Sequence, residues 1–147
     1  MKNALERNFK EGQYVYVVHY WYTNNGMQAF KTWAKIFEID ESKQVFSAFL
    51  YDDTYKVYSF KDYGRLIFDT SNEAEEAAER LPKPQTIVFQ VIGKKVYKKI
   101  VIGIDEQYTD GVYDLVVCLN KGKDVSTKEI GHSLFINESD ARKQHKR

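Results

Sequence analysis

One run of residues in this chain occurs twice, 67 positions apart and without a gap. In the first copy it reads Ser59, Lys61, Asp62, Gly64, Ile67, Phe68, Thr70, Asn72, Glu73 and Ala74, and in the second Ser126, Lys128, Glu129, Gly131, Leu134, Phe135, Asn137, Ser139, Asp140 and Ala141. An internal repeat indicates that each copy folds as one unit, and differences between copies point to what has been specialised. The sequence therefore predicts two similar units in tandem.

The match extends toward the N-terminus of each copy with a change of offset. Residues 39–41 match 104–106 at an offset of 65, whereas residues 15–18 best match 88–91 at an offset of 73. The first copy therefore holds eight more residues between its first two strands. This insertion lengthens the first hairpin of the first copy.

The boundary between the copies coincides with the only two prolines, Pro82 and Pro84, which favour an extended link. We therefore predict an N-terminal leader over 1–11, a first β repeat over 12–81 and a second over 86–147, which ends in a basic tail. A unit of roughly 60 residues is marginally stable alone. We expect the two repeats to pack as one unit.

Most segments of each copy are rich in aromatic and β-branched residues, which is typical of strands. The expected strands cover 14–22, 30–39, 45–51, 55–59, 66–68, 87–92, 96–104 and 112–119, with hairpin signals at Asn25-Gly26, Gly93-Lys94 and Asp110-Gly111. Each copy then predicts a helix, capped by Thr70 and Glu73 or by Asn137 and Asp140. The fold class that follows is mainly β (α+β), with two tandem SH3-like small β-barrel or meander repeats, each ending in a short C-terminal helix.

The ending formed by Gly64, Ile67, Phe68, Thr70, Glu73 and Ala74 resembles one found in small uncharacterised proteins of Gram-positive bacteria and their phages and mobile elements, written G-x-x-[VI]-F-x-T-x-x-E-A. The second copy matches at Gly131, Leu134, Phe135 and Ala141, but places Asn137 for the threonine and Asp140 for the glutamate. The resemblance covers about 16 residues per copy and carries no function. It implies a phage or mobile-element setting.

Composition argues against several classes of function. The net charge of +1 is unlike that of a strongly basic nucleic-acid binder. His19, His132 and His145 lack metal-ligand spacing, and Cys118 is surrounded by apolar residues, so we expect no metal, no cofactor and no catalytic residues. We expect a cytoplasmic protein, because the sequence has neither the apolar stretch of a signal peptide nor a membrane-spanning run.

Aromatic residues are distributed unevenly between the copies. Residues 1–80 hold 17 of the 22 aromatic side chains, although both copies need cores of similar size. Strand alternation places some of this surplus on the surface of the lengthened hairpin. The candidate partner-binding residues are Tyr20, Trp21, Tyr22, Met27, Phe30 and Trp33.

Two other interpretations of these residues remain open. The aromatic hairpin packs against the second repeat as core, or its rings stack on the bases of a single-stranded nucleic acid. For nucleic acid, the candidate contacts are Lys95, Lys99, Arg142 and Lys143, where Lys95 and Lys99 share one face of a strand.

These patterns together favour a non-enzymatic protein-interaction or adaptor module that binds a protein or peptide. In a phage or mobile-element setting, an inhibitor of a host enzyme would be one such module. The alternatives are a nucleic-acid-binding accessory protein and, last, a small enzyme.

Overall fold

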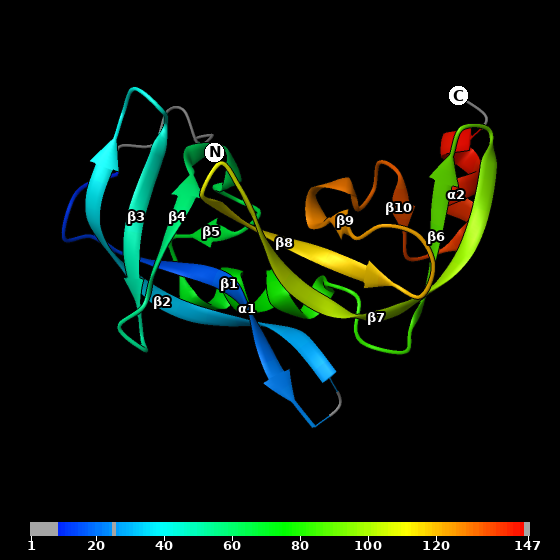
Figure 1. Ribbon diagram of the computed structural model, residues 1–147, viewed down its shortest axis with the longest axis horizontal. Coiled ribbons are helices and arrows are strands. Elements are labelled where there is room, and N and C mark those ends of the chain that lie inside the picture. The colour runs from blue at the N-terminus through cyan, green and yellow to red at the C-terminus, as the bar shows by residue number, and fades with distance from the viewer. Residues whose placement is uncertain (1–8, 25, 146–147) are drawn as a thin grey trace. The chain divides into compact units, whose positions relative to one another are not determined.

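The computed structural model describes residues 9–24 and 26–145 (Figure 1). The first half contains β1 (Tyr14–Thr23), β2 (Gly26–Asp40), β3 (Val45–Leu50), β4 (Tyr55–Ser59), the 3-10 helix η1 (Phe60–Asp62), β5 (Ile67–Phe68) and α1 (Ser71–Arg80). The second half contains β6 (Ile87–Ile92), β7 (Lys95–Thr109), β8 (Val112–Leu119), β9 (Val125–Ser126), the 3-10 helix η2 (Thr127–Glu129), β10 (Leu134–Phe135) and α2 (Glu138–His145). Among the described residues, no helix has the length and apolar character needed to cross a membrane.

The strands form two antiparallel five-stranded sheets with the same arrangement. The order is β4-β3-β2-β1-β5 in one sheet and β9-β8-β7-β6-β10 in the other. In each, a short late strand returns to pair with the first, as Phe68 does with Tyr16 and Phe135 with Phe89. The prediction of a mainly β chain is confirmed. Both orders have two ends, so neither sheet closes into a barrel within the described residues.

The tails of the two halves share their local hydrogen bonds. The backbone N–H of Gly64 donates to the carbonyl of Ile67, and that of Gly131 donates to Leu134, both at 2.8 Å. The following helices are capped as expected. The N–H of Glu73 donates to the Thr70 hydroxyl, and the N–H of Asp140 donates to the Asn137 side chain.

Hairpin turns form where Gly and Asp signals were found. Asp110 and Gly111 both have positive φ, at 52° and 81°, which matches the right-handed twist of the flanking β7 and β8. Gly93 and Lys94 join β6 to β7, since Ile92 pairs directly with Lys95. Of the Asn25-Gly26 signal, Asn25 lies outside the described residues.

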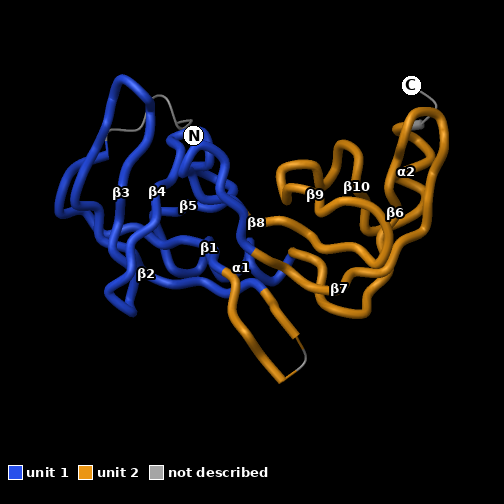
Figure 2. The backbone as a smooth tube through the Cα atoms, in the orientation of Figure 1, with its two compact units in different colours: residues 1–19, 29–80, 106–114 blue, residues 20–28, 81–105, 115–147 orange. Residues whose placement is uncertain are grey.

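The chain divides into two compact units that do not follow the proline link (Figure 2). Unit 1 combines the described part of residues 1–19 with 29–80 and 106–114, and unit 2 combines 20–28 and 81–105 with the described part of 115–147. Hence the end of the β1–β2 hairpin belongs to unit 2, and the end of the β7–β8 hairpin belongs to unit 1. Local sequence signals do not predict that each hairpin end belongs to the other unit, because this depends on contacts between distant segments.

The core of unit 1 is largely aromatic. The ring of Phe9 lies 4.9 Å from Phe46 and 5.0 Å from Phe60, measured between centroids. Tyr58 on β4 is fully buried, and its ring lies 5.4 Å from that of Tyr113. Because Tyr113 is also fully buried, residues 106–114 complete this core rather than cover it.

The core of unit 2 is built mainly from aliphatic side chains. Its buried residues are Val88, Val101, Ile104, Leu115, Val116, Val117, Leu119, Leu134, Phe135 and Ala141. Gly103 on β7 allows residues 20–28 to approach closely, since a Cβ at this position would lie 3.0 Å from the backbone oxygen of Met27. Met27 and Gly103 thus pack backbone against backbone.

Candidate functional site

Side chains alternate between two sides along β2, β3 and β4 in unit 1. On one side Ala34, Ile36, Ala48, Leu50 and Tyr58 are buried. On the other side Lys35 lies opposite Phe49, and Phe49 lies opposite Tyr55. This second side faces away from the core.

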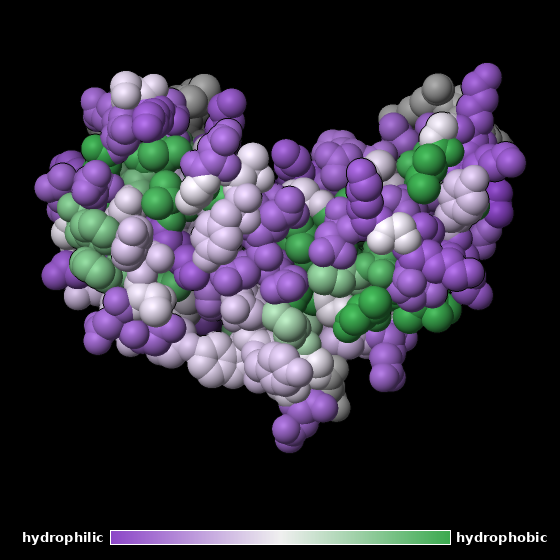
Figure 3. All heavy atoms as spheres, in the orientation of Figure 1, coloured by the Kyte–Doolittle hydropathy of each residue, from purple (hydrophilic) through white to green (hydrophobic). Residues whose placement is uncertain are grey.

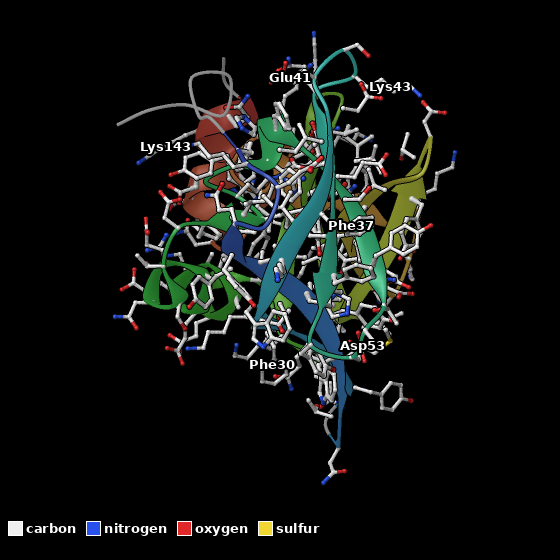
Figure 4. All side chains as sticks on the ribbon, turned by 90° about the vertical axis from the view of Figure 1, so that its left-hand side faces the viewer. Phe30, Phe37, Glu41, Lys43, Asp53 and Lys143 are labelled. Atoms are coloured by element: carbon white, nitrogen blue, oxygen red, sulfur yellow. The ribbon has the colours of Figure 1, made fainter. Side chains whose placement is uncertain are left out.

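A β-bulge adds Phe37 to the outward side. The pairing of β2 with β3 shifts between Ile36 and Glu38, so that Phe37 and Glu38 together oppose Ser47. The ring of Phe37 stacks on Phe49 at 4.2 Å and meets Tyr55 edge-on at 5.8 Å. Figure 4 shows Phe37 midway along β2, between Phe30 and Glu41.

We call the outward rings of this sheet the aromatic face, which consists of Tyr14, Trp33, Phe37, Phe49 and Tyr55. Tyr14 exposes 57% of its surface and Tyr55 59%, whereas Trp33 and Phe49 each expose 41%. Tyr14 meets Trp33 edge-on at 5.8 Å, and the Lys35 ammonium lies over the Tyr14 ring. Figure 3 shows hydrophobic surface over β3 and β4. Exposed apolar surface gathered on one side of a sheet is typical of interaction sites in soluble proteins.

A pocket of about 480 Å³ adjoins the aromatic face within unit 1. Glu38, Asp40 and Asp110 line it, and Lys43 is its one cation among the described lining residues. The pocket is also lined by Val45 and Ser47 of β3 and Val57 of β4. These positions lie on the same side of the sheet as Phe49 and Tyr55. We call this the acidic pocket.

Two carboxylates near these surfaces also hold turns. Asp40 accepts hydrogen bonds from the Ser42 hydroxyl at 2.7 Å and the Lys43 amide at 3.2 Å, which lower the pKa of its carboxyl. Asp52 accepts from the Thr54 hydroxyl at 2.6 Å, which lowers its pKa in the same way. Both groups are therefore negatively charged at neutral pH.

The structure does not bring the six predicted hairpin residues together in one unit. Tyr20, Trp21, Tyr22 and Met27 belong to unit 2, and Phe30 and Trp33 to unit 1. Trp21 is 46% exposed, Tyr22 76% and Phe30 44%. Tyr20 and Met27 are half-buried. Met27 packs against Gly103 of the second repeat, whereas the rings of Trp21, Tyr22 and Phe30 are exposed.

Sequence reasoning missed Phe37, Phe49 and Tyr55. The alternation of buried Ala48 and Leu50 with Phe49 was a signal that could have placed Phe49 on the surface. Phe37 carried no such signal, because the bulge changes which side it occupies.

Residues 106–114, which we call the clasp segment, take part in a polar network within unit 1. The His19 ring stacks on Tyr113 at 5.4 Å, and its Nδ1 lies 2.8 Å from the Tyr113 hydroxyl. Burial lowers the pKa of His19, against a smaller opposing effect of Glu106. The imidazole is therefore mostly neutral at pH 7.

Two charged side chains of the first repeat anchor the clasp segment. Lys56 donates a hydrogen bond to the Tyr108 hydroxyl and forms an ion pair with Glu106 at 3.5 Å. Arg65 Nη2 bonds Asp62 at 2.7 Å and Asp114 at 2.9 Å. These contacts satisfy the charges of the network within the unit, so they are best explained as structural.

We expect the free energy of unfolding to fall as the pH drops from 7.5 to 5.5. Because the pKa of His19 in the folded chain lies below its ordinary 6.5, the unfolded chain binds a proton that the folded chain does not. The free energy of unfolding is therefore highest above about pH 6.5 and declines as the pH falls below that value. Urea denaturation at both pH values measures this, and His19→Gln should reduce the decline. Equal declines in the two proteins would contradict the role of His19.

Other reactive groups show no arrangement for chemistry. Burial raises the pKa of the Cys118 thiol to about 11, so the thiol stays protonated at neutral pH and is a poor nucleophile. In the described part of the chain, no three His, Cys, Asp or Glu side chains are grouped to hold a metal ion.

The predicted nucleic-acid contacts are partly engaged by the protein itself. Lys99 donates to the carbonyl of Lys121 at 2.9 Å, and Arg142 pairs with Glu138 at 2.8 Å. Lys143 lies beside Asp140 along a small groove at α2. Lys95 is exposed and shares a side of β7 with Lys99 and with the exposed ring of Tyr97.

Comparison with known proteins adds no family to this geometry. No protein-family model matches the chain, and no significant match is found among curated proteins.

Proposed function

We propose that this chain is a non-enzymatic module that binds a protein or peptide partner through exposed aromatic side chains. The observation that carries the proposal is the exposure of Trp21 and Tyr22 on unit 2 and of Phe30 and Trp33 on unit 1. Tryptophan and tyrosine are enriched at interaction hot spots, because they give a large contact area and a polar group for little entropy cost. A partner that covers these rings removes apolar surface from water.

The SH3-like interpretation of each repeat belongs with this proposal. Each half has three long strands, then a short strand and a 3-10 turn, and a final short strand that returns to the first. In this interpretation the hairpin lengthened in the first repeat occupies the position of a ligand-contacting loop. The second repeat supports the first.

The proposal is tested by affinity capture from the native host followed by mass spectrometry. We expect the chain to retain a specific protein, and Trp33→Ala or the double change Trp21→Ala with Tyr22→Ala to reduce its recovery by about tenfold or more. Ile136, which is 56% exposed, provides a control in Ile136→Ala. Equal recovery with all variants, at unchanged melting temperatures, would contradict the proposal.

One observation favours nucleic acid as a second candidate. Alternate positions of β7, which share one side of the strand, hold Lys95, Tyr97 and Lys99. The Tyr97 ring therefore lies between two lysines along the strand. Such interleaving suits base stacking with phosphate contacts. Binding of an oligothymidylate that weakens steeply between 50 and 300 mM salt and is lost in Tyr97→Ala would support this candidate.

A further inference from the structure

We propose that the aromatic face and the acidic pocket of unit 1 together bind a basic, extended segment of the partner protein. This inference rests on the proposed function and names the surface and the chemistry of its ligand. It uses Phe37, Phe49, Tyr55 and the pocket carboxylates, none of which belongs to the predicted hairpin site.

The two surfaces are continuous along β3. Phe49 belongs to the aromatic face, and Ser47 and Val45, at successive outward positions of the same strand, line the acidic pocket. On β2 the bulge joins them, since Phe37 stacks on Phe49 while its neighbour Glu38 lines the pocket. Successive outward positions on a strand are about 7 Å apart. An extended segment of four to six residues therefore spans both surfaces.

The charge around this surface is opposite to that of a basic ligand. The described lining of the acidic pocket contains the carboxylates of Glu38, Asp40 and Asp110, and one ammonium group, that of Lys43. These four side chains have a net charge of −2 on a chain whose total is +1. Complementary charge steers a cationic partner to the surface and disfavours nucleic acid, whose phosphates it repels. Figure 4 shows Glu41 and Lys43 at one end of this surface and Asp53 at the other.

The rings provide a second kind of contact for a cation. Lys35 already places its ammonium 5.6 Å from the centroid of the Tyr14 ring. Phe49 and Tyr55 expose ring surface on the same side of the sheet. Arginine suits such a site best, because its planar guanidinium stacks on rings and pairs with carboxylates. We therefore assign the ligand as a segment in which Arg or Lys alternates with apolar residues.

The experiment is selection of a random twelve-residue peptide display library on the intact chain, followed by fluorescence anisotropy with the best peptide. We expect the selected peptides to be basic. Phe49→Ala with Tyr55→Ala should weaken binding by at least tenfold, and Glu38→Gln with Asp110→Asn by about tenfold. Raising the salt from 50 to 300 mM should weaken it by a similar factor. Lys98→Gln, at an exposed side chain of unit 2, is the control and should leave the dissociation constant unchanged.

Neutral or acidic selected peptides would overturn the inference, as would basic peptides that bind the Phe49→Ala, Tyr55→Ala variant unchanged. If those peptides instead lose binding in Trp21→Ala with Tyr22→Ala, the inference fails and the proposed function stands. If no peptide is selected and no host protein is captured, both fail. Tyr55→Ala alone, at a side chain 59% exposed, repeats the test should the double variant fold poorly.

Discussion

Replacement of Tyr113 by alanine is expected to lower the free energy of unfolding by about 3–5 kcal/mol. The side chain is fully buried in unit 1, where its ring contacts those of His19, Tyr58 and Tyr108 at centroid distances between 5.4 and 5.8 Å. Its removal leaves a cavity in the aromatic core and separates the clasp segment from that core. For a chain of this length the melting temperature should fall by about 10–20 °C.

Two matched variants separate the causes of this loss. Tyr113→Phe removes only the hydroxyl that lies 2.8 Å from His19, so it should cost about 1 kcal/mol. Tyr108→Ala truncates a tyrosine of the same segment that is 44% exposed, and should cost less than Tyr113→Ala. Thermal and urea denaturation measure all three. A loss below 1 kcal/mol in Tyr113→Ala would mean that residues 106–114 do not complete the core of unit 1.

Gly103→Val is expected to destabilise the chain by about 1–3 kcal/mol through overpacking. A Cβ at this position would lie 3.0 Å from the backbone oxygen of Met27 and 3.6 Å from its backbone nitrogen. Backbone atoms relax less readily than the end of a side chain, so residues 20–28 should be displaced from unit 2. Hydrogen exchange at the amides of residues 20–24 and 26–28 should become faster, while exchange in α1 of unit 1 should change little.

The control for this prediction is Ile102→Val on the same strand. Ile102 is 60% exposed, so the change should stay within about 0.5 kcal/mol of the parent. Unchanged stability together with unchanged exchange in Gly103→Val would contradict the close packing of Met27 on this glycine.

The strands and turns of this fold were predictable because their signals are local. β-branched and aromatic runs mark the strands, and Asp110-Gly111 has the positive φ angles that the β7–β8 turn requires. The caps at Thr70 and Asn137 likewise depend on residues only three positions away. The lengths of β2 and β7 were underestimated, since both continue beyond the segments of highest strand propensity.

The division into compact units was not predictable from these signals. The proline link at Pro82 and Pro84 separates the repeats in sequence, but Tyr113 and Met27 each pack in a unit built mainly from the other repeat. Such packing depends on complementary surfaces of distant segments, for which one sequence carries no local pattern.

The candidate site was predicted only in part. The surplus of aromatic residues in the first repeat indicated exposed rings, and Trp21, Tyr22, Phe30 and Trp33 are exposed. Of the aromatic face, the predicted site contained only Trp33, because recognising the other rings requires the strand register and the bulge at Phe37. The acidic pocket was missed for a similar reason, since Asp110 from the clasp segment lies there beside Glu38 and Asp40.

The exposed rings are proposed to contact a protein partner directly. The most direct measurement is photo-crosslinking in the host, with a benzophenone-bearing phenylalanine placed at Tyr22, at Trp33 or at Ile136, so that an aromatic ring is kept at the first two sites. We predict that the same host protein is crosslinked from positions 22 and 33 and not from 136. Crosslinking no stronger from 22 and 33 than from 136 would contradict the claim.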